Sequence, residues 1–122
     1  MRYAETDKMG IAYYSNYFVW FEVGRCDLFR SLGQTYQNLE TQGVLLPVIE
    51  ACCVFRKSAR YDDELEIVTS GSLLSPVRIE FLYEVRRRAD SIQLARGRTV
   101  HAVIDLSGRP RRLPEPIQVV LK

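Results

Sequence analysis

The most constraining feature of the sequence is a helix-forming segment over residues 16–32, which carries apolar side chains on almost every side of its first half. Ser15 and Asn16 are both favourable N-cap residues, and Gly33 suits the position just after a helix ends. A helix at a protein surface keeps one polar face, so this pattern predicts a helix enclosed by protein. The rest of the fold must therefore wrap around it.

Strand patterns fill most of the remaining chain. The clearest lies at residues 78–86, where apolar side chains alternate with mostly charged ones. Gly97 marks a bulge or a close approach in a long strand, and Gly71 is one of the residues predicted to separate strands. The predicted strands cover residues 2–5, 48–56, 65–70, 78–86, 92–106 and 117–121.

One long helix followed by antiparallel strands predicts an α+β fold. A strongly twisted sheet of about five strands can curl around a single central helix and cover most of its sides. The length of 122 residues suits a single domain, residues 1–122. Unpaired edges of such a sheet favour association with a second copy, so we expect a homodimer rather than a monomer.

The charge balance argues against nucleic-acid binding. Seventeen basic and fifteen acidic residues give a net charge of +2, without the broad basic footprint that nucleic acid requires. The arginines at 86–88 are interpreted as a solvated strand end, whereas those at 109–112 leave small-anion binding open. The sequence has no apolar run of about 20 residues and no leader pattern, so we expect no membrane insertion and a cytoplasmic location.

The cysteine and histidine content favours neither a metal site nor a disulfide framework. The number of cysteines, three, is odd, and no two of them form a CxxC motif. His101 is the single histidine. No GxSxG motif accompanies His101, so we interpret it as a hydrogen-bonded structural residue. Cys52 and Cys53 are adjacent in a predicted strand and should point to opposite faces of the sheet.

Two carboxylates near the apolar helix are candidates for chemistry. Asp7 precedes Gly10 and a dense aromatic block, and spacing alone favours a turn residue over a catalytic one. Glu22 lies two turns into the helix and can pair with Arg25 at i, i+3, so we interpret it as a structural residue that is buried or faces an interface. The aromatic residues further along the helix are expected in the core, namely Tyr17, Phe18 and Phe21.

The stretch RYAETDKMGIAYYSNYFVWFEVGR resembles the signature of the hotdog-fold 4-hydroxybenzoyl-CoA thioesterase family, and within it the bacterial acyl-CoA thioesterases associated with the Tol-Pal system. The similarity continues through FRKSARYDDELEI and HAVIDLSGRPRRLPEP, so it spans nearly the whole chain. The resemblance implies a hotdog fold, an antiparallel sheet wrapped round a central helix. It also implies homodimers that assemble into homotetramers, with active sites at the dimer interface.

The resemblance also implies roles for three residues near the start of the chain. Asp7 takes the position of the catalytic carboxylate, and the backbone N–H of Tyr14 takes that of the group that polarises the thioester. Tyr3 matches a tyrosine proposed to assist catalysis. Many bacterial relatives carry histidine at the Tyr14 position, and this chain does not, so no histidine side chain acts there.

Substrate contacts are expected at the helix entrance and from basic residues. Tyr13 and Asn16 stand at the entrance, where they would line the pocket. The phosphates of coenzyme A require cations near the pocket mouth, and the candidates include Arg56, Lys57, Arg60 and Arg109. Neither a metal nor another cofactor is expected.

Two functions follow as hypotheses. The first is an acyl-CoA thioesterase that hydrolyses a short-chain or aromatic acyl-CoA to free acid and CoA, with Asp7 as nucleophile or general base. The alternative is a non-catalytic hotdog module that binds acyl-CoA or acyl carrier protein, which the tyrosine at position 14 keeps open. The release of free thiol distinguishes the two.

Overall fold

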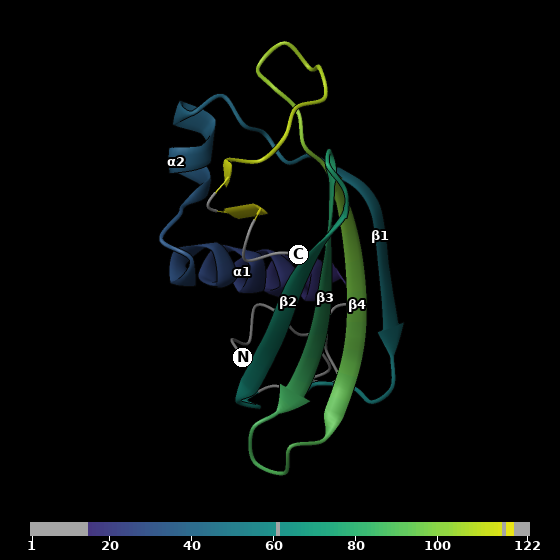
Figure 1. Cartoon of the computed structure of the whole chain (residues 1–122). Coiled ribbons are helices and arrows are strands. Elements are labelled where there is room, and N and C mark those ends of the chain that lie inside the picture. The colour runs from purple at the N-terminus through teal and green to yellow at the C-terminus, as the bar shows by residue number, and fades with distance from the viewer. Residues whose placement is uncertain (1–14, 61, 116, 119–122) are drawn as a thin grey trace.

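The computed structural model describes residues 15–60, 62–115 and 117–118, and it consists of two helices packed on one side of an antiparallel sheet (Figure 1). Within these residues the sheet has four strands in the order β1-β4-β3-β2. The elements are α1 (Ser15–Ser31), α2 (Tyr36–Thr41), β1 (Val48–Phe55), β2 (Leu65–Ser75), β3 (Arg78–Arg87) and β4 (Gln93–Ala102). The α+β arrangement of a sheet around one long helix is confirmed.

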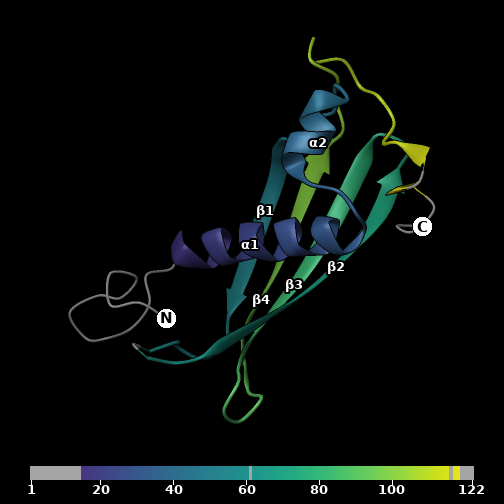
Figure 2. The ribbon, with the colours of Figure 1, turned by 90° about the vertical axis from the view of Figure 1, so that its left-hand side faces the viewer.

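Helix α1 lies across the inner face of the sheet (Figure 2). The contact follows from the alternation in β3, whose residues at 79, 81, 83 and 85 are buried. The ring of Phe21 on α1 stacks on that of Tyr83, with centroids 4.3 Å apart, and Phe29 meets Phe81 edge to face at 5.7 Å. Aromatic pairs of this geometry add to the gain from burial, so they fix α1 on β3.

Gly97 allows this close packing, as its place in the sequence predicted. A Cβ atom there would collide with the ring of Phe21 and would lie 3.2 Å from the backbone oxygen of Cys52. Gly97 pairs with Tyr83 on one side and with Cys53 on the other, so it stands on the inner face beneath α1. The absence of a side chain therefore creates the space that Phe21 occupies.

The strand boundaries differ from the predictions in three places. Gly71 does not separate strands: it pairs with Phe81 inside β2, because ladder bonds to the long β3 outweigh the weak strand preference of glycine. β4 ends at Ala102, and Ile104 instead makes isolated bridges to Leu45 and Pro110. The strand predicted at 117–121 is wrong where it is described, because Ile117 begins no ladder and its N–H donates to Pro114 O in a helical turn.

The sheet has one strand fewer than the expected five within the described residues. The short strand predicted at residues 2–5 lies outside them.

Helix α2 was not predicted. Gly33, with φ of 78°, ends α1 as expected, and the chain then turns back. The Thr35 hydroxyl accepts a hydrogen bond from the N–H of Asn38 and caps α2, while Leu39 is buried. The capping threonine was the available signal, but a six-residue helix has too few apolar positions to show a period.

One side of α1 is open in the single chain, which corrects the expectation of an enclosed helix. Phe18, Val19 and Val23 are 40%, 55% and 51% exposed. Phe18 was expected in the core, whereas Tyr17 and Phe21 are buried as predicted. The exposed side of α1 lies beside β1, because Phe18 and Val19 line a cavity together with Val48 and Ala51 of that strand. We call Phe18, Val19 and Val23 the α1 stripe.

Candidate active site

Four of the predicted site residues lie outside the described part of the chain, namely Tyr3, Asp7, Tyr13 and Tyr14. Their roles remain predictions. The structure describes the first turns of α1, the neighbouring strands and the candidate basic residues, and these define the surroundings in which the predicted chemistry would occur.

The beginning of α1 is held against the end of β1. Tyr17 is buried, and its ring lies 4.7 Å from that of Trp20 and 4.9 Å from that of Phe55, the last residue of β1. Asn16 is half-buried next to it. The first N–H groups of a helix lack partners within the helix and stand at the positive end of its dipole, so this end favours a developing negative charge. The aromatic contacts fix the position of that end.

A cavity of about 310 Å³ opens beside α1, between the helix and the β1 side of the sheet. Its wall is mostly apolar, with a polar portion that contains two charged residues. The lining residues are Phe18, Val19, Glu22, Arg25, Val48, Ala51 and Thr99. We call it the α1 cavity. It has the size of small ligand sites, which start at about 300 Å³.

The polar portion of the α1 cavity is anchored by Arg25, which is only 9% exposed. Its Nη1–H donates to the Tyr83 hydroxyl at 2.9 Å, and its Nε–H donates to the Tyr36 hydroxyl at 3.1 Å. The Tyr83 oxygen lies 2.6 Å from Thr99 Oγ1. The two tyrosines come from α2 and β3, so the guanidinium joins α1 to both.

His101 extends this network and is a structural residue, as predicted. Its Nδ1 lies 2.8 Å from Leu46 O and its Nε2 lies 2.9 Å from Thr99 Oγ1. Burial lowers the pKa of the His101 ring, so the ring is neutral at pH 7. A carbonyl can only accept, so Nδ1 carries the proton and Nε2 accepts from the Thr99 hydroxyl.

The expected pairing of Glu22 with Arg25 is absent. Among the described residues no carboxylate forms an ion pair with Arg25, although Glu22 lines the same cavity. The Arg25 guanidinium instead donates hydrogen bonds to two tyrosine hydroxyls, and both tyrosines come from more distant parts of the chain. Sequence reasoning therefore missed Arg25 as a site residue, and the available signal was a cation four positions after the buried Phe21.

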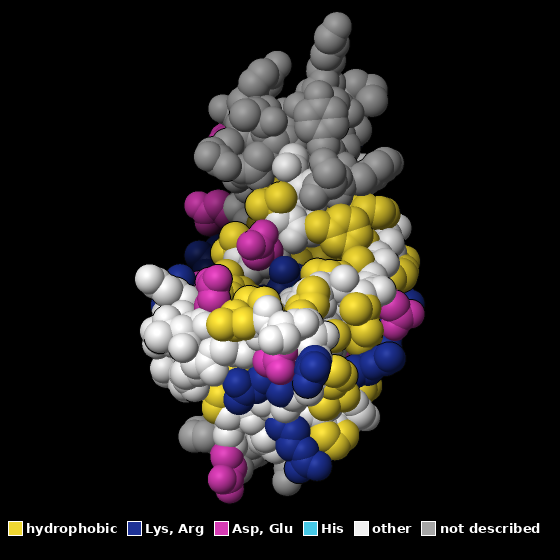
Figure 3. Space-filling view, turned by 90° about the horizontal axis from the view of Figure 1, so that it is seen from above, with side chains coloured by type: hydrophobic (Ala, Val, Ile, Leu, Met, Phe, Trp, Pro, Cys, Tyr) yellow, Lys and Arg dark blue, Asp and Glu magenta, His cyan; other side chains and the backbone are white. Residues whose placement is uncertain are grey.

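The predicted basic residues fall into two separate places. Arg56 and Lys57 follow directly on β1, and both of their N–H groups donate to Leu94 O, so this loop lies at the end of the sheet where Phe55 meets Tyr17. Arg60 is exposed in the same loop. Arg109 lies beyond the other end of β4, in the loop that Asp105 closes. Figure 3 looks down on this second end and shows Lys and Arg side chains gathered there.

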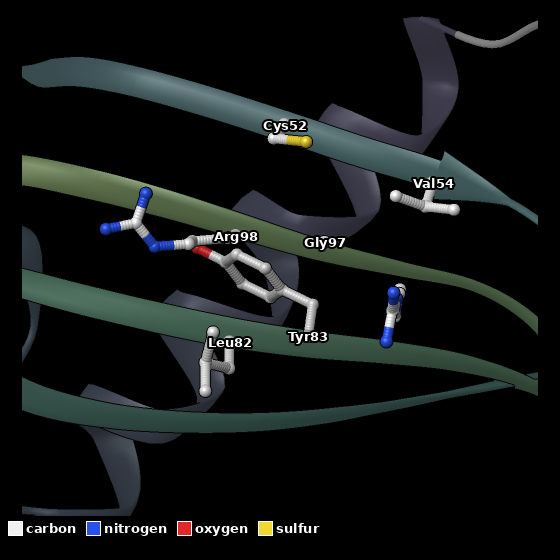
Figure 4. Close-up of a pocket in the computed structure, with 7 residues that line it drawn as sticks. Cys52, Val54, Leu82, Tyr83, Gly97 and Arg98 are labelled. Atoms are coloured by element: carbon white, nitrogen blue, oxygen red, sulfur yellow. The ribbon is translucent and has the colours of Figure 1, made fainter.

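A second cavity, of about 370 Å³, lies on the outer face of the sheet, away from α1 (Figure 4). Val54, Leu82 and Cys52 form its apolar wall. Arg98 at its edge is bound by Glu80 and lies 3.6 Å from Glu50. None of its lining residues belongs to α1, whereas the α1 cavity is lined by Phe18 and Val19 from the first turns of that helix, so we regard the α1 cavity as the candidate site. No cluster able to hold a metal ion occurs in the described residues.

The family model that matches the chain is the Thioesterase-like superfamily, over residues 1–121. The chain therefore belongs to this family.

Individual relatives agree with that assignment. YneP of Bacillus subtilis is 45% identical over 69 residues, which are 57% of this chain and half of the length of YneP. The acyl-CoA thioesterase YbgC of Haemophilus influenzae is 27% identical over 95% of this chain and 85% of its own. The crystal structure of Slr0204, a 1,4-dihydroxy-2-naphthoyl-CoA thioesterase from Synechocystis, matches with a TM-score of 0.92 and 25% identity over 99% of this chain and 90% of its own.

These matches confirm the hotdog thioesterase fold that the sequence predicted. The narrower resemblance, to the 4-hydroxybenzoyl-CoA subfamily and the Tol-Pal-associated enzymes, stays a prediction. None of the helices described is long and apolar enough to span a membrane.

Proposed function

We propose that this protein hydrolyses acyl-CoA thioesters to a free acid and CoA. The observation that carries the proposal is the α1 cavity beside the first turns of α1, in a chain whose family is thioesterase-like. Two similar proteins support the same class of reaction, because YbgC is an acyl-CoA thioesterase and Slr0204 is a 1,4-dihydroxy-2-naphthoyl-CoA thioesterase.

The proposed chemistry needs a nucleophile and a stabiliser for the carbonyl oxygen. Asp7 would either attack the thioester carbonyl carbon or remove a proton from a water that attacks it. The oxygen then gains negative charge, which the N–H of Tyr14 at the entrance of α1 would stabilise. One such donor commonly contributes about a hundred- to a thousand-fold in rate. The C–S bond breaks and CoA leaves as a thiol after taking up a proton, with Tyr3 assisting.

Direct attack by Asp7 would give a mixed anhydride, which a water then hydrolyses to the acid. Attack by water gives the acid in one addition and elimination. Both routes consume one water and release one thiol, so the balance of the reaction is the same.

The position of loop 56–60 favours it as the phosphate-binding element. Arg56 and Lys57 stand next to the contact between Phe55 and Tyr17, at the beginning of α1. Tyr13 and Asn16 would contact the substrate at the same end. Arg109 lies at the opposite end of the sheet in the same chain, so we propose that it serves a site completed by another subunit.

We further propose that the protein is a homodimer in which a second copy covers the α1 stripe. β1 forms one edge of the sheet in the described residues, its Val48, Ile49 and Phe55 are exposed, and Val48 lines the α1 cavity together with Phe18 and Val19. Antiparallel pairing of β1 with its symmetry mate would continue the sheet and bury both apolar surfaces. The exposed Leu82 and Val54 on the outer face would then be available for assembly of a tetramer.

Hydrolysis is tested by following thiol release from a panel of hydroxybenzoyl-, 1,4-dihydroxy-2-naphthoyl-, short-chain and long-chain acyl-CoA. We expect Asp7→Asn to lower kcat by at least roughly a hundred-fold while the fold stays intact. Asp27→Asn is the matched control, because Asp27 is exposed on α1 and pairs only with Arg30 among the described residues. Near-normal turnover by Asp7→Asn would remove Asp7 from the mechanism.

The alternative function, a module that binds acyl-CoA or acyl carrier protein, gives a different result. Calorimetry would then show saturable binding while no acyl-CoA in the panel releases thiol.

A further inference from the structure

The loop that follows β1, loop 56–60, is held in place by its backbone. The N–H groups of Arg56 and Lys57 both donate to the carbonyl oxygen of Leu94, at 2.8 and 3.0 Å, and Leu94 is fully buried in the core. Ala59, further along the loop, is also fully buried. The backbone is therefore fixed to β4 and to the core, while the long side chains of the loop extend from it.

The cations of this loop have no ion-pair partners among the described residues. Arg56, Lys57 and Arg60 are all exposed, and none of them forms an ion pair with a described carboxylate. Cations on a fixed backbone suit an anion with several charges, because little of the loop must be ordered when the anion binds. The phosphates of CoA form such an anion, and the proposed function assigns them to this loop.

The residue directly before this loop contacts the helix at which the thioester would react. Phe55 ends β1, and its ring meets that of Tyr17 edge to face, with centroids 4.9 Å apart. Tyr17 is buried in the first turn of α1, and Tyr14, whose N–H is proposed to stabilise the carbonyl oxygen, comes three residues earlier in the sequence. Phe55 is 41% exposed, so it is the less firmly packed partner of this contact. An aromatic contact thus joins the proposed phosphate-binding loop to the start of α1.

We propose that Phe55 is a positioning residue, which transmits the binding of the substrate phosphates at loop 56–60 to the start of α1. The inference rests on the proposed thioesterase function. Binding energy from a part of the substrate that does not react can orient the part that does, and an error of about 1 Å there can reduce a rate about a hundred-fold. Phosphates bound by Arg56 would restrict the end of β1, because Arg56 follows Phe55 directly. The Phe55 ring would then hold Tyr17 and the beginning of the helix against the thioester.

The kinetic test compares a CoA ester with the pantetheine ester of the same acyl group. The pantetheine ester has the same thioester but no phosphate, and the acyl group is the one that is hydrolysed fastest in the panel. We expect the wild type to have a kcat at least roughly ten-fold higher for the CoA ester. Phe55→Leu should reduce this ratio toward unity, while KM for the CoA ester stays close to that of the wild type.

Two further variants separate positioning from binding and from packing. Lys57→Gln removes a proposed phosphate contact, so it should raise KM for the CoA ester and leave KM for the pantetheine ester unchanged. Phe55→Tyr keeps the ring that meets Tyr17, so it should retain the wild-type ratio of kcat values.

Three kinetic outcomes would overturn the proposal. An equal loss of kcat for both esters in Phe55→Leu would show that the residue acts only through stability or dimer assembly. Loss of the ratio in Phe55→Tyr would show that the ring contact is not what matters. Equal kcat values for the two esters in the wild type would leave nothing to transmit. This last result needs no variant, so the test stays valid if Phe55→Leu folds poorly.

A spectroscopic test does not depend on hydrolysis. Trp20 is the single tryptophan, and its ring lies 4.7 Å from that of Tyr17, so its fluorescence reports on the start of α1. Adenosine 3′,5′-bisphosphate carries phosphate groups of CoA without the thioester arm. Its binding should change the emission of Trp20 in the wild type and in Phe55→Tyr but not in Phe55→Leu, whereas calorimetry should give similar affinities for all three.

The fluorescence results also separate this inference from the proposed hydrolysis. No binding of the bisphosphate to the wild type, no change of emission on binding, or a change that survives in Phe55→Leu would overturn the role of Phe55 even if thiol release is normal. A change of emission that requires the aromatic ring at position 55, without thiol release from any acyl-CoA, would support the positioning role and refute hydrolysis.

Discussion

The two sides of α1 are built differently. Toward β2 and the centre of the sheet, the helix packs so closely that a Cβ atom on Gly24 would collide with Thr69, and Gly97 makes room for Phe21. Toward β1, the same helix leaves a cavity of about 310 Å³ and exposes apolar side chains. Glycines remove volume on the packed side, and two charged residues line the cavity on the open side. The helix is thus a structural element on one side and a candidate binding wall on the other.

The largest expected effect tests the packed side. Gly97→Val should destabilise the protein by about 3 kcal/mol, because its side chain would displace the Phe21 ring, which is fully buried and stacked on Tyr83. Chemical denaturation measures the change. Arg96→Val on the same strand is the control, since Arg96 is exposed on the outer face, and it should change stability little. Equal stability of the two variants would show that α1 is not tightly packed there.

A smaller effect concerns pH and the residues behind the open side. Burial depresses the pKa of His101 below its usual 6.5, so the unfolded chain binds more protons than the folded one as pH falls. The stabilising contribution is complete above pH 6.5 and is lost as pH drops toward the folded pKa. The loss is at most about 1.4 kcal/mol per pH unit. Denaturation curves between pH 7.5 and 5 should show this slope.

The matched variant for this measurement is His101→Gln, which should flatten the pH dependence even if it lowers stability at every pH. An unchanged slope would assign the pH dependence to other groups.

The smallest effect tests the open side. Val23→Ser should alter the stability of the single chain by no more than about 0.5 kcal/mol, because Val23 is 51% exposed. The same substitution should weaken the proposed homodimer, which analytical ultracentrifugation over a concentration series would measure. Val68→Ser is the control, an exposed valine on β2 at the other edge of the sheet. Equal dissociation constants for the two variants would place the dimer contact elsewhere.

Local patterns predicted much of the fold. Capping residues and Gly33 located α1 within one residue at each end, and alternation located β3. The close approach at Gly97 was also confirmed. The prediction that Gly71 separates strands was wrong, because its place inside β2 depends on pairing with β3. This pairing is a tertiary effect that the local sequence does not encode.

The candidate site was less predictable than the fold. The hydrogen bond from Arg25 to Tyr83 joins residues 58 positions apart, and no spacing rule connects them. The neighbouring Glu22 suggested a simple helical ion pair, but Tyr83 of β3 and Tyr36 of α2 supply the acceptors for the guanidinium. His101 was interpreted correctly because the sequence offered no nucleophile motif beside it. The assignments of Asp7 and Tyr14 rest on the resemblance and stay predictions.

The adjacent cysteines of β1 differ in exposure, so a thiol reagent should modify one of them selectively. Cys52 is exposed on the outer face, whereas Cys53 packs against the core, where burial raises its pKa to about 11, and burial also raises the pKa of Cys26. The thiolate is the form that attacks a thiol reagent, so a maleimide dye at neutral pH should label Cys52 first. A fluorophore at that site would report on events along β1 without disturbing the interior.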